Sequence, residues 1–132
     1  MAFEQDIDRF VNKTLQRASM LPRKLAFELL IRITERMPVD TGRAKANTQL
    51  SIRHRPQGSL PDTDPTGAQV LSKGQATLAG YSLGDVIWIA NNIEYIMELE
   101  HGRSKQAPGG MFRVSVEDVL QAWPQIVTEV KR

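Results

Sequence analysis

The residues whose types and spacing could do chemistry gather around position 100, where Glu98-x-x-His101 places a carboxylate and an imidazole three residues apart. On a helix this spacing puts both groups on one face, which is half of the ligand set of a di-iron bundle. A di-iron site needs a second copy of the motif, and the chain has only two histidines and no cysteine. We therefore predict no metal and no cofactor. We expect His101 to end a helix, where the helix dipole favours its charged form.

Other catalytic arrangements find little support in the spacing. Gly109-Gly110 is followed by Met-Phe rather than by Lys-Ser or Lys-Thr, so it does not predict a phosphate-binding loop. Glu98 and Glu100 are two residues apart and point to different sides of a helix, which suits a general acid and base poorly. A metal-dependent nuclease needs several converging carboxylates, and the spacing supports no such group among Asp40, Asp85 and Glu94. We predict that the protein is not an enzyme.

The elements that position these residues begin with two helical patterns. Apolar residues at 3-4-3 spacing predict an amphipathic helix over residues 3–18, and a second stripe predicts a helix over 22–37. Pro22 suits a first helical turn and disfavours helical geometry at Leu21, so we expect a break or bend near residues 19–22. Pro38 ends the second helix, and Asp40-Thr41-Gly42 favours a turn.

The rest of the chain mixes strands, helices and loops. The alternation over 47–54 predicts a strand with one wet face, and the apolar run 86–90 predicts a strand buried on both faces. Trp88 and Trp123 are therefore expected in the core. Helices are expected over 66–79, over 93–101 closed by Gly102, and from Ser115 onward with a bend at Pro124; a short strand is expected at 111–114. We expect flexible loops at 55–66 and 103–110.

This order of elements predicts one α+β domain over residues 1–132. Its sheet is small and mostly antiparallel, with about three strands, and it packs against long N-terminal and C-terminal helices. The longest apolar run has five residues, whereas a membrane-spanning helix needs about 20, so no membrane association is expected. The acids Glu4, Asp6 and Asp8 stand where a secretory signal would be basic and then apolar. We expect the protein to be made in the cytoplasm.

Charge is divided along the chain although the net charge is only +2. Residues 38–58 carry a net charge of +3, residues 59–102 carry −5, and residues 103–113 carry three basic side chains and no acid. Two interpretations remain open. The charges are either separate solvated faces, or complementary patches that meet between subunits and set their register.

Three segments together resemble the small neck or tail-completion family of siphophages and their prophages. They are Pro38-Val39-Asp40-Thr41-Gly42-Arg43-Ala44-Lys45-Ala46-Asn47, the stretch Ile89-Ala90-Asn91-Asn92 leading to Tyr95, and Glu100-x-Gly102-x-Ser104-Lys105-Gln106-Ala107-Pro108-Gly109-Gly110-Met111. The resemblance spans nearly the whole chain. It implies a non-enzymatic virion protein at the junction between head and tail.

The resemblance implies a homo-oligomeric ring, a hexamer or another closed oligomer, between the head connector and the tail tube. Its implied partners are head-completion or connector proteins and tail terminator or tail-tube proteins, with DNA passing through without tight binding. Our hypothesis is that basic side chains of one subunit meet acidic side chains of the next. Tyr95 either packs under the preceding strand or faces a partner. The subunit-interface candidates are Arg43, Lys45, Arg53, Arg55, Glu94, Tyr95, Glu98 and Glu100. Loops 55–66 and 103–110 would dock on neighbouring rings, with Arg103, Lys105 and Gln106 as contact candidates.

Two alternatives stay open. A tail terminator that caps the tail tube occupies the same junction. A DNA-binding module would use the basic stretches 38–58 and 103–113, although these lack the interleaved aromatic residues of single-strand binders.

Overall fold

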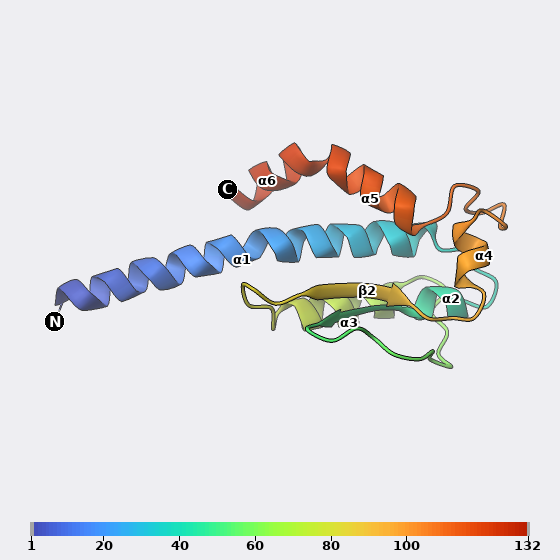
Figure 1. Cartoon of the computed structure of the whole chain (residues 1–132), viewed down its shortest axis with the longest axis horizontal. Coiled ribbons are helices and arrows are strands. Elements are labelled where there is room, and N and C mark those ends of the chain that lie inside the picture. Colours follow the sequence, from blue (N-terminus) through green and yellow to red (C-terminus); the bar gives the residue numbers. More distant parts are fainter. Residues whose placement is uncertain (1, 132) are drawn as a thin grey trace.

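A computed structural model describes residues 2–131 and gives an α+β fold with a long N-terminal helix (Figure 1). The elements in chain order are α1 (Ala2–Arg36), α2 (Arg43–Ala46), β1 (Thr48–Ile52), α3 (Ala68–Leu78), β2 (Ile87–Asn91), α4 (Ile96–Glu100), α5 (Phe112–Gln121) and α6 (Trp123–Lys131). Helix α1 runs through the middle. Helices α5 and α6 lie on one side of it, and β1, β2 and α3 lie on the other (Figure 1).

The sheet of the described residues has two antiparallel strands, in a register that pairs Thr48 with Asn91 and Ile52 with Ile87. The expected third strand at 111–114 is wrong, because residues 112–114 form the first turn of α5. The carboxylate of Glu100 accepts hydrogen bonds from the amides of residues 111, 112 and 113, which supplies acceptors for the free N–H groups of a helix start. Ser115 does not begin the helix. It is fully buried within α5, and its hydroxyl accepts a hydrogen bond from Arg36 at 3.1 Å.

Helix α1 continues through Pro22, so the two predicted helical stretches form one helix, and of the expected break or bend near residues 19–22 the break is wrong. Proline removes one hydrogen bond to the preceding turn and disfavours helical geometry at Leu21. Packing outweighs that cost here. Leu30 and Ile33 are buried on the C-terminal side of the proline, and α6 packs along the helix on its N-terminal side.

The main buried cluster lies at the C-terminal end of α1. It joins Ile33 of α1 and Met37, just after α1, to residues from three later segments, namely Ala44 of α2, Ile93 after β2, and Ala107 and Met111 in the loop after α4. Burial of these side chains draws the turn after α1, the residues after β2 and the loop after α4 into one place. Hydrophobic burial therefore organises the end of the molecule where the three family-like segments lie.

Two tryptophans that the apolar pattern places in the core are partly exposed, so that prediction is wrong. Trp88 of β2 is 37% exposed and Trp123 at the start of α6 is 43% exposed. Ile87 and Ile89 of β2 face α1 across an open groove, and Trp88, which alternates with them along the strand, lies on the other face of the sheet. The expected bend near Pro124 is present as the break between α5 and α6 at Ala122, with proline in the first turn of α6, where its missing N–H costs nothing.

Candidate functional site

The three family-like segments meet at the end of the molecule opposite the N-terminus. We define the end surface as residues 38–47, 91–95 and 100–111. Asn91 donates its side-chain amide to the carbonyl of Ala44 at 2.8 Å. The side chain of Gln106 accepts a hydrogen bond from the amide of Val39 at 2.9 Å and donates one to its carbonyl at 3.2 Å. Segments that are more than 40 residues apart in sequence are thus joined directly.

A recess of about 370 Å³ opens on the end surface. Its wall is formed by the turn 38–44 on one side and by Tyr95, Leu99, Ser104 and Gln106 on the other. Tyr95 is half-buried and packs against the core cluster rather than standing free. The recess is a place where a side chain of a partner protein fits, and it is lined by all three family-like segments.

Glu100 fixes the two ends of the loop that follows α4. Its Oε2 accepts from the amides of Met111 and Phe112 and its Oε1 from Arg113, each at 3.0 Å. Burial acts to raise the pKa of this carboxyl, but the three backbone donors outweigh it and lower the pKa below its ordinary value. A negative charge at the start of α5 is also favoured by the helix dipole. Glu100 therefore positions α5 against α4.

Two glycines let the loop close tightly. Gly102 has a φ of +89° and Gly110 has a φ of +86°, a region that favours glycine. A Cβ at Gly102 would lie 2.3 Å from the carbonyl oxygen of Pro108, and one at Gly110 would lie 2.4 Å from the carbonyl oxygen of Glu100. The expectation that Gly102 ends α4 in left-handed geometry is confirmed.

Arg43 and Glu94 form an ion pair across the end surface within one chain, with Nη1 3.0 Å from Oε1. A hydrogen bond from its own backbone amide, followed by that from Arg43, lowers the pKa of the exposed Glu94 carboxyl. The pairing ties the turn after α1 to the residues after β2. Both were predicted to lie at a subunit interface, which stays a prediction; the structure shows that their charges are already matched intramolecularly.

The other interface candidates divide by exposure. Lys45 is buried at the base of the end surface, and Arg53 pairs with Asp85 at 3.0 Å. Glu98 pairs with Arg103 at 3.3 Å instead of with His101. Arg55 and Lys105 are exposed. Reversing the charges of both Glu98 and Glu100 is thus a poor interface test, because the Glu100 carboxylate binds the amides at the start of α5 and its reversal would disturb the fold.

Loops 55–66 and 103–110 are joined to the body at several points. The fully buried Asn47 donates its side-chain amide to the carbonyl of Leu60 at 3.0 Å and accepts from the amide of Leu60 at 2.6 Å. The buried Asp64 accepts from the amide of Val70 at 2.9 Å at the start of α3. In the second loop, Ala107 inserts into the core cluster.

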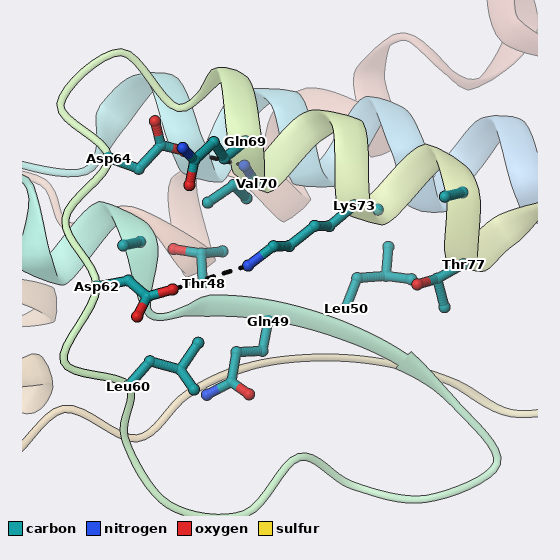
Figure 2. A pocket seen from close by; sticks show the side chains of 13 residues that line it. Thr48, Gln49, Leu50, Leu60, Asp62, Asp64, Gln69, Val70, Lys73 and Thr77 are labelled. Carbon is teal, nitrogen blue, oxygen red and sulfur yellow. Dashed lines mark hydrogen bonds and ion pairs between the residues drawn. The ribbon is translucent and has the colours of Figure 1, made fainter.

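A second recess of about 390 Å³ lies between β1, α3 and the loop through Leu60 (Figure 2). Lys73 extends across it toward Asp62, with 3.9 Å between Nζ and Oδ2. Asp64 lines the recess, but its carboxylate is engaged by the amide of Val70. The recess therefore presents one long surface ion pair, without a set of converging polar groups.

One pentapeptide was overlooked in the sequence: Gly80-Tyr81-Ser82-Leu83-Gly84 matches the Gly-x-Ser-x-Gly spacing of a nucleophile elbow. An elbow needs a strand before the serine and a helix after it. Here the pentapeptide follows α3 and precedes β2, so the order is reversed. Ser82 donates its backbone amide to Asp85 at 3.0 Å, and in the described part of the chain neither histidine side chain is hydrogen-bonded to Ser82. The match is a turn.

Neither a cluster of metal-ligating side chains nor a membrane-spanning helix is present among the described residues. Over residues 2–131, no three histidine, aspartate or glutamate side chains are grouped as metal ligands. No helix in that same range is long and apolar enough to cross a membrane.

One feature missed from the sequence is an apolar groove. An open groove of about 500 Å³ runs between α1, β2 and the helices α5 and α6, floored by Leu25, Leu29 and Ile33 of α1. Its lining residues are Pro22, Leu25, Ala26, Leu29, Ile33, Ile87, Ile89, Phe112, Val116, Val119, Leu120 and Trp123. The apolar stripes of these elements were recognised, but strand 86–90 and Trp123 were assigned to the core, and no groove was predicted. The N-terminal part of α1 likewise leaves its stripe uncovered.

Comparisons with protein-family models, with curated proteins and with solved structures find no match to this chain.

Proposed function

We propose that the protein is a non-enzymatic structural component of a tailed bacteriophage, acting in a ring at the junction between the head connector and the tail tube. The observation that carries the proposal is the convergence of the three family-like segments on one end surface. Residues 38–47, 91–95 and 100–111 are joined there by hydrogen bonds and by the core cluster. Segments that carry a family resemblance are expected to meet where members of that family make a common contact with their partners.

The end surface suits a joint between proteins. Its recess is lined by neutral residues together with Asp40 and Arg43, and its shape is fixed by the Arg43–Glu94 pair and by the Glu100 contacts. A rigid surface loses little conformational entropy when a partner docks. Arg55 and Lys105 stand exposed on the two adjoining loops. In this proposal these two charges contact the neighbouring proteins, while Arg43, Glu94 and Glu100 hold the surface in shape.

The charge balance fits a position beside a DNA channel. The net charge is +2, and five arginines are held by carboxylates in the same chain: Arg32, Arg36, Arg43, Arg53 and Arg103. Tight DNA binding depends on many cations that reach phosphates, so these five pairs reduce the number of cations that are free to bind DNA. DNA sliding past such a ring would not be held.

The test is removal of the gene from the phage or prophage that carries it, followed by electron microscopy of the lysate. The expected result is filled heads and separate tails of normal length, which join when the purified protein is added. Joined, infectious particles in the absence of the gene would overturn the proposal. Tails of uncontrolled length would assign the tail-terminator role instead.

Point variants in the same joining assay test the end surface. Lys105→Glu is expected to reduce joining at least tenfold, since it reverses an exposed charge on the docking loop. Lys73→Glu is the matched control, because Lys73 lies on α3 beside the second recess. Equal effects of both variants would overturn the assignment of the end surface. Salt-dependent DNA binding by the wild-type protein, lost with Lys105→Glu, would favour a DNA-binding module.

A further inference from the structure

The N-terminal part of α1 projects beyond the other elements (Figure 1). Its apolar side chains are exposed along one stripe. Phe3 and Phe10 are 74% and 71% exposed, and Ile7, Val11 and Leu15 are about half exposed. An unsupported helix of about 15 residues is marginally stable in water. A partner that covers this stripe would remove apolar area from water and stabilise the helix at the same time.

The stripe is continuous with the floor of the apolar groove. From Phe10 and Thr14 the same 3-4 spacing runs on through Ala18 and Pro22 to Leu25 and Leu29, so the uncovered stripe and the groove floor lie on one face of one helix. At 1.5 Å per residue, the uncovered stripe over 3–15 spans about 18 Å and the floor over 22–33 about 17 Å. The two halves of the face match in length, and only the second half has walls.

We propose that a second copy of this chain occupies the groove. Two copies pair with their α1 helices antiparallel about a two-fold axis near Ala18, and the bare N-terminal half of each lies between α5 and β2 of the other. Because both surfaces share one face of α1, an antiparallel pair fills both grooves at once. Such a contact is self-complementary and closed, as two-fold symmetry requires.

Charge favours the antiparallel direction. Residues 3–8 carry three acids and no basic side chain, namely Glu4, Asp6 and Asp8. At the opposite end of the groove, the lining residue Phe112 is followed by the exposed Arg113 at the start of α5. The antiparallel arrangement brings the acids towards Arg113 and sets the two helix dipoles in opposite directions.

The extent of the contact fits a stable pair. The groove has 12 lining residues, and the projecting half of α1 adds the stripe and its polar neighbours. Together these approach the 20–30 residues per partner of a standard interface. The rim of the groove already presents Leu120, 64% exposed, and Trp123 to solvent.

The first test is the mass of the full chain in solution, by light scattering during gel filtration across the micromolar range. Twice the monomer mass is expected. Phe10→Glu on the projecting half and Leu120→Glu on the groove rim are each expected to weaken pairing at least about 30-fold, as for loss of a central apolar contact. Met97→Glu is the matched control, since Met97 is 60% exposed on α4, outside both surfaces.

All three variants replace exposed side chains, so they should remain folded, which circular dichroism checks. A wild-type monomer throughout the concentration range would overturn the proposal and leave the groove to a different protein. A pair that survives Phe10→Glu and Leu120→Glu unchanged would also overturn it.

The second test fixes the axis, using the absence of cysteine from the chain. Ala18→Cys places its sulfur beside its own copy on the two-fold axis, so air oxidation should give a covalent pair. Gln16→Cys, two residues away and on the opposite face of the helix, should stay reduced. Equal cross-linking of both variants would exclude the antiparallel pair.

The pair does not depend on the proposed function, because it uses α1, α5 and β2 and leaves the recess of the end surface open. Phe10→Glu tests pairing, and Lys105→Glu tests joining of heads to tails. If Phe10→Glu leaves pairing unchanged, the proposed pair is wrong. If Lys105→Glu leaves the joining of heads to tails unchanged, the proposed role of the end surface is wrong.

Discussion

The carboxylate of Glu100, at the end of α4, lies 3.0 Å from the amide nitrogen of Met111, just before α5 begins. The same carboxylate holds the next two amides, so one side chain supplies acceptors for three N–H groups of a helix start that follows 11 to 13 residues later. The loop between them is closed on itself, with Ala107 in the core. The end surface and the position of α5 thus depend on one charged group.

Replacing Glu100 with glutamine should lower the free energy of unfolding by about 2 kcal/mol, the upper end of the effect of losing a helix cap. Glutamine keeps one oxygen acceptor but loses the charge, and its amide group faces N–H donors. Urea denaturation followed by circular dichroism measures the change. Glu98→Gln is the control, because it removes only an exposed ion pair with Arg103 and should cost less than about 0.5 kcal/mol. Equal costs for the two variants would contradict the role given to Glu100.

The same contact predicts a loss of stability in acid. The pKa of Glu100 is lower in the folded chain than its ordinary value of 4.5, so the ionised form binds the amides more strongly than the protonated form. Its contribution is complete above the unfolded pKa and disappears as the pH falls through the folded pKa. Denaturation midpoints of wild type and Glu100→Gln should therefore converge between about pH 5 and pH 3. A constant difference over that range would contradict the prediction.

The periodic elements could be predicted from sequence because their stripes are local. The stripe over 22–37 and the alternation over 47–54 correspond to the C-terminal half of α1 and to β1. The contacts of the end surface could not be predicted, since they join residues such as Val39 and Gln106 that are 67 positions apart. The start of α5 was predicted wrongly for the same reason, because the carboxylate that caps this helix belongs to α4.

The apolar pattern also could not say which stripes are covered within the chain. The same 3-4 spacing runs from Phe3 to Ile33, yet Phe3 is exposed and Ile33 is buried. The spacing of apolar residues shows which face of a helix is apolar. Only the three-dimensional arrangement shows how much of that face the other elements cover. Trp88 and Trp123 were misplaced for this reason, because their apolar neighbours do pack inside.

Gly110→Ala should destabilise the fold by more than about 2 kcal/mol. The added Cβ meets the carbonyl oxygen of Glu100 at 2.4 Å, and the φ of +86° is itself unfavourable for alanine. Gly58→Ala separates the two causes, because Gly58 has a φ of +70° but no atom within 4 Å of the added Cβ. It should cost only about 1 kcal/mol, the conformational part alone. Thermal unfolding of both variants measures the difference, and equal losses would show that the contact with Glu100 is not tight.

Charge exchange between Arg43 and Glu94 should reveal whether their pair acts within the chain. Arg43→Glu alone and Glu94→Arg alone should each lower the free energy of unfolding through like-charge contact, and the double exchange should recover most of the loss. The double-mutant cycle is measured on protein diluted below the concentration at which any oligomer forms. Recovery that appears only at high concentration would place the pair between subunits, contrary to the intrachain contact.

The side chain of Asn47 should control the loop that follows β1. It is fully buried, accepts from the amide of Leu60 at 2.6 Å and donates to the carbonyls of Arg43 and Leu60. Asn47→Ala leaves the backbone of Leu60 without these partners, so we expect a loss of about 2 kcal/mol and faster hydrogen exchange at the Leu60 amide. Gln49→Ala is the control, because Gln49 makes one exposed bond of 3.3 Å to Gly58 in the same loop. Unchanged exchange at Leu60 in the Asn47 variant would mean that the loop is held by other contacts, with Asp64 the next residue to replace.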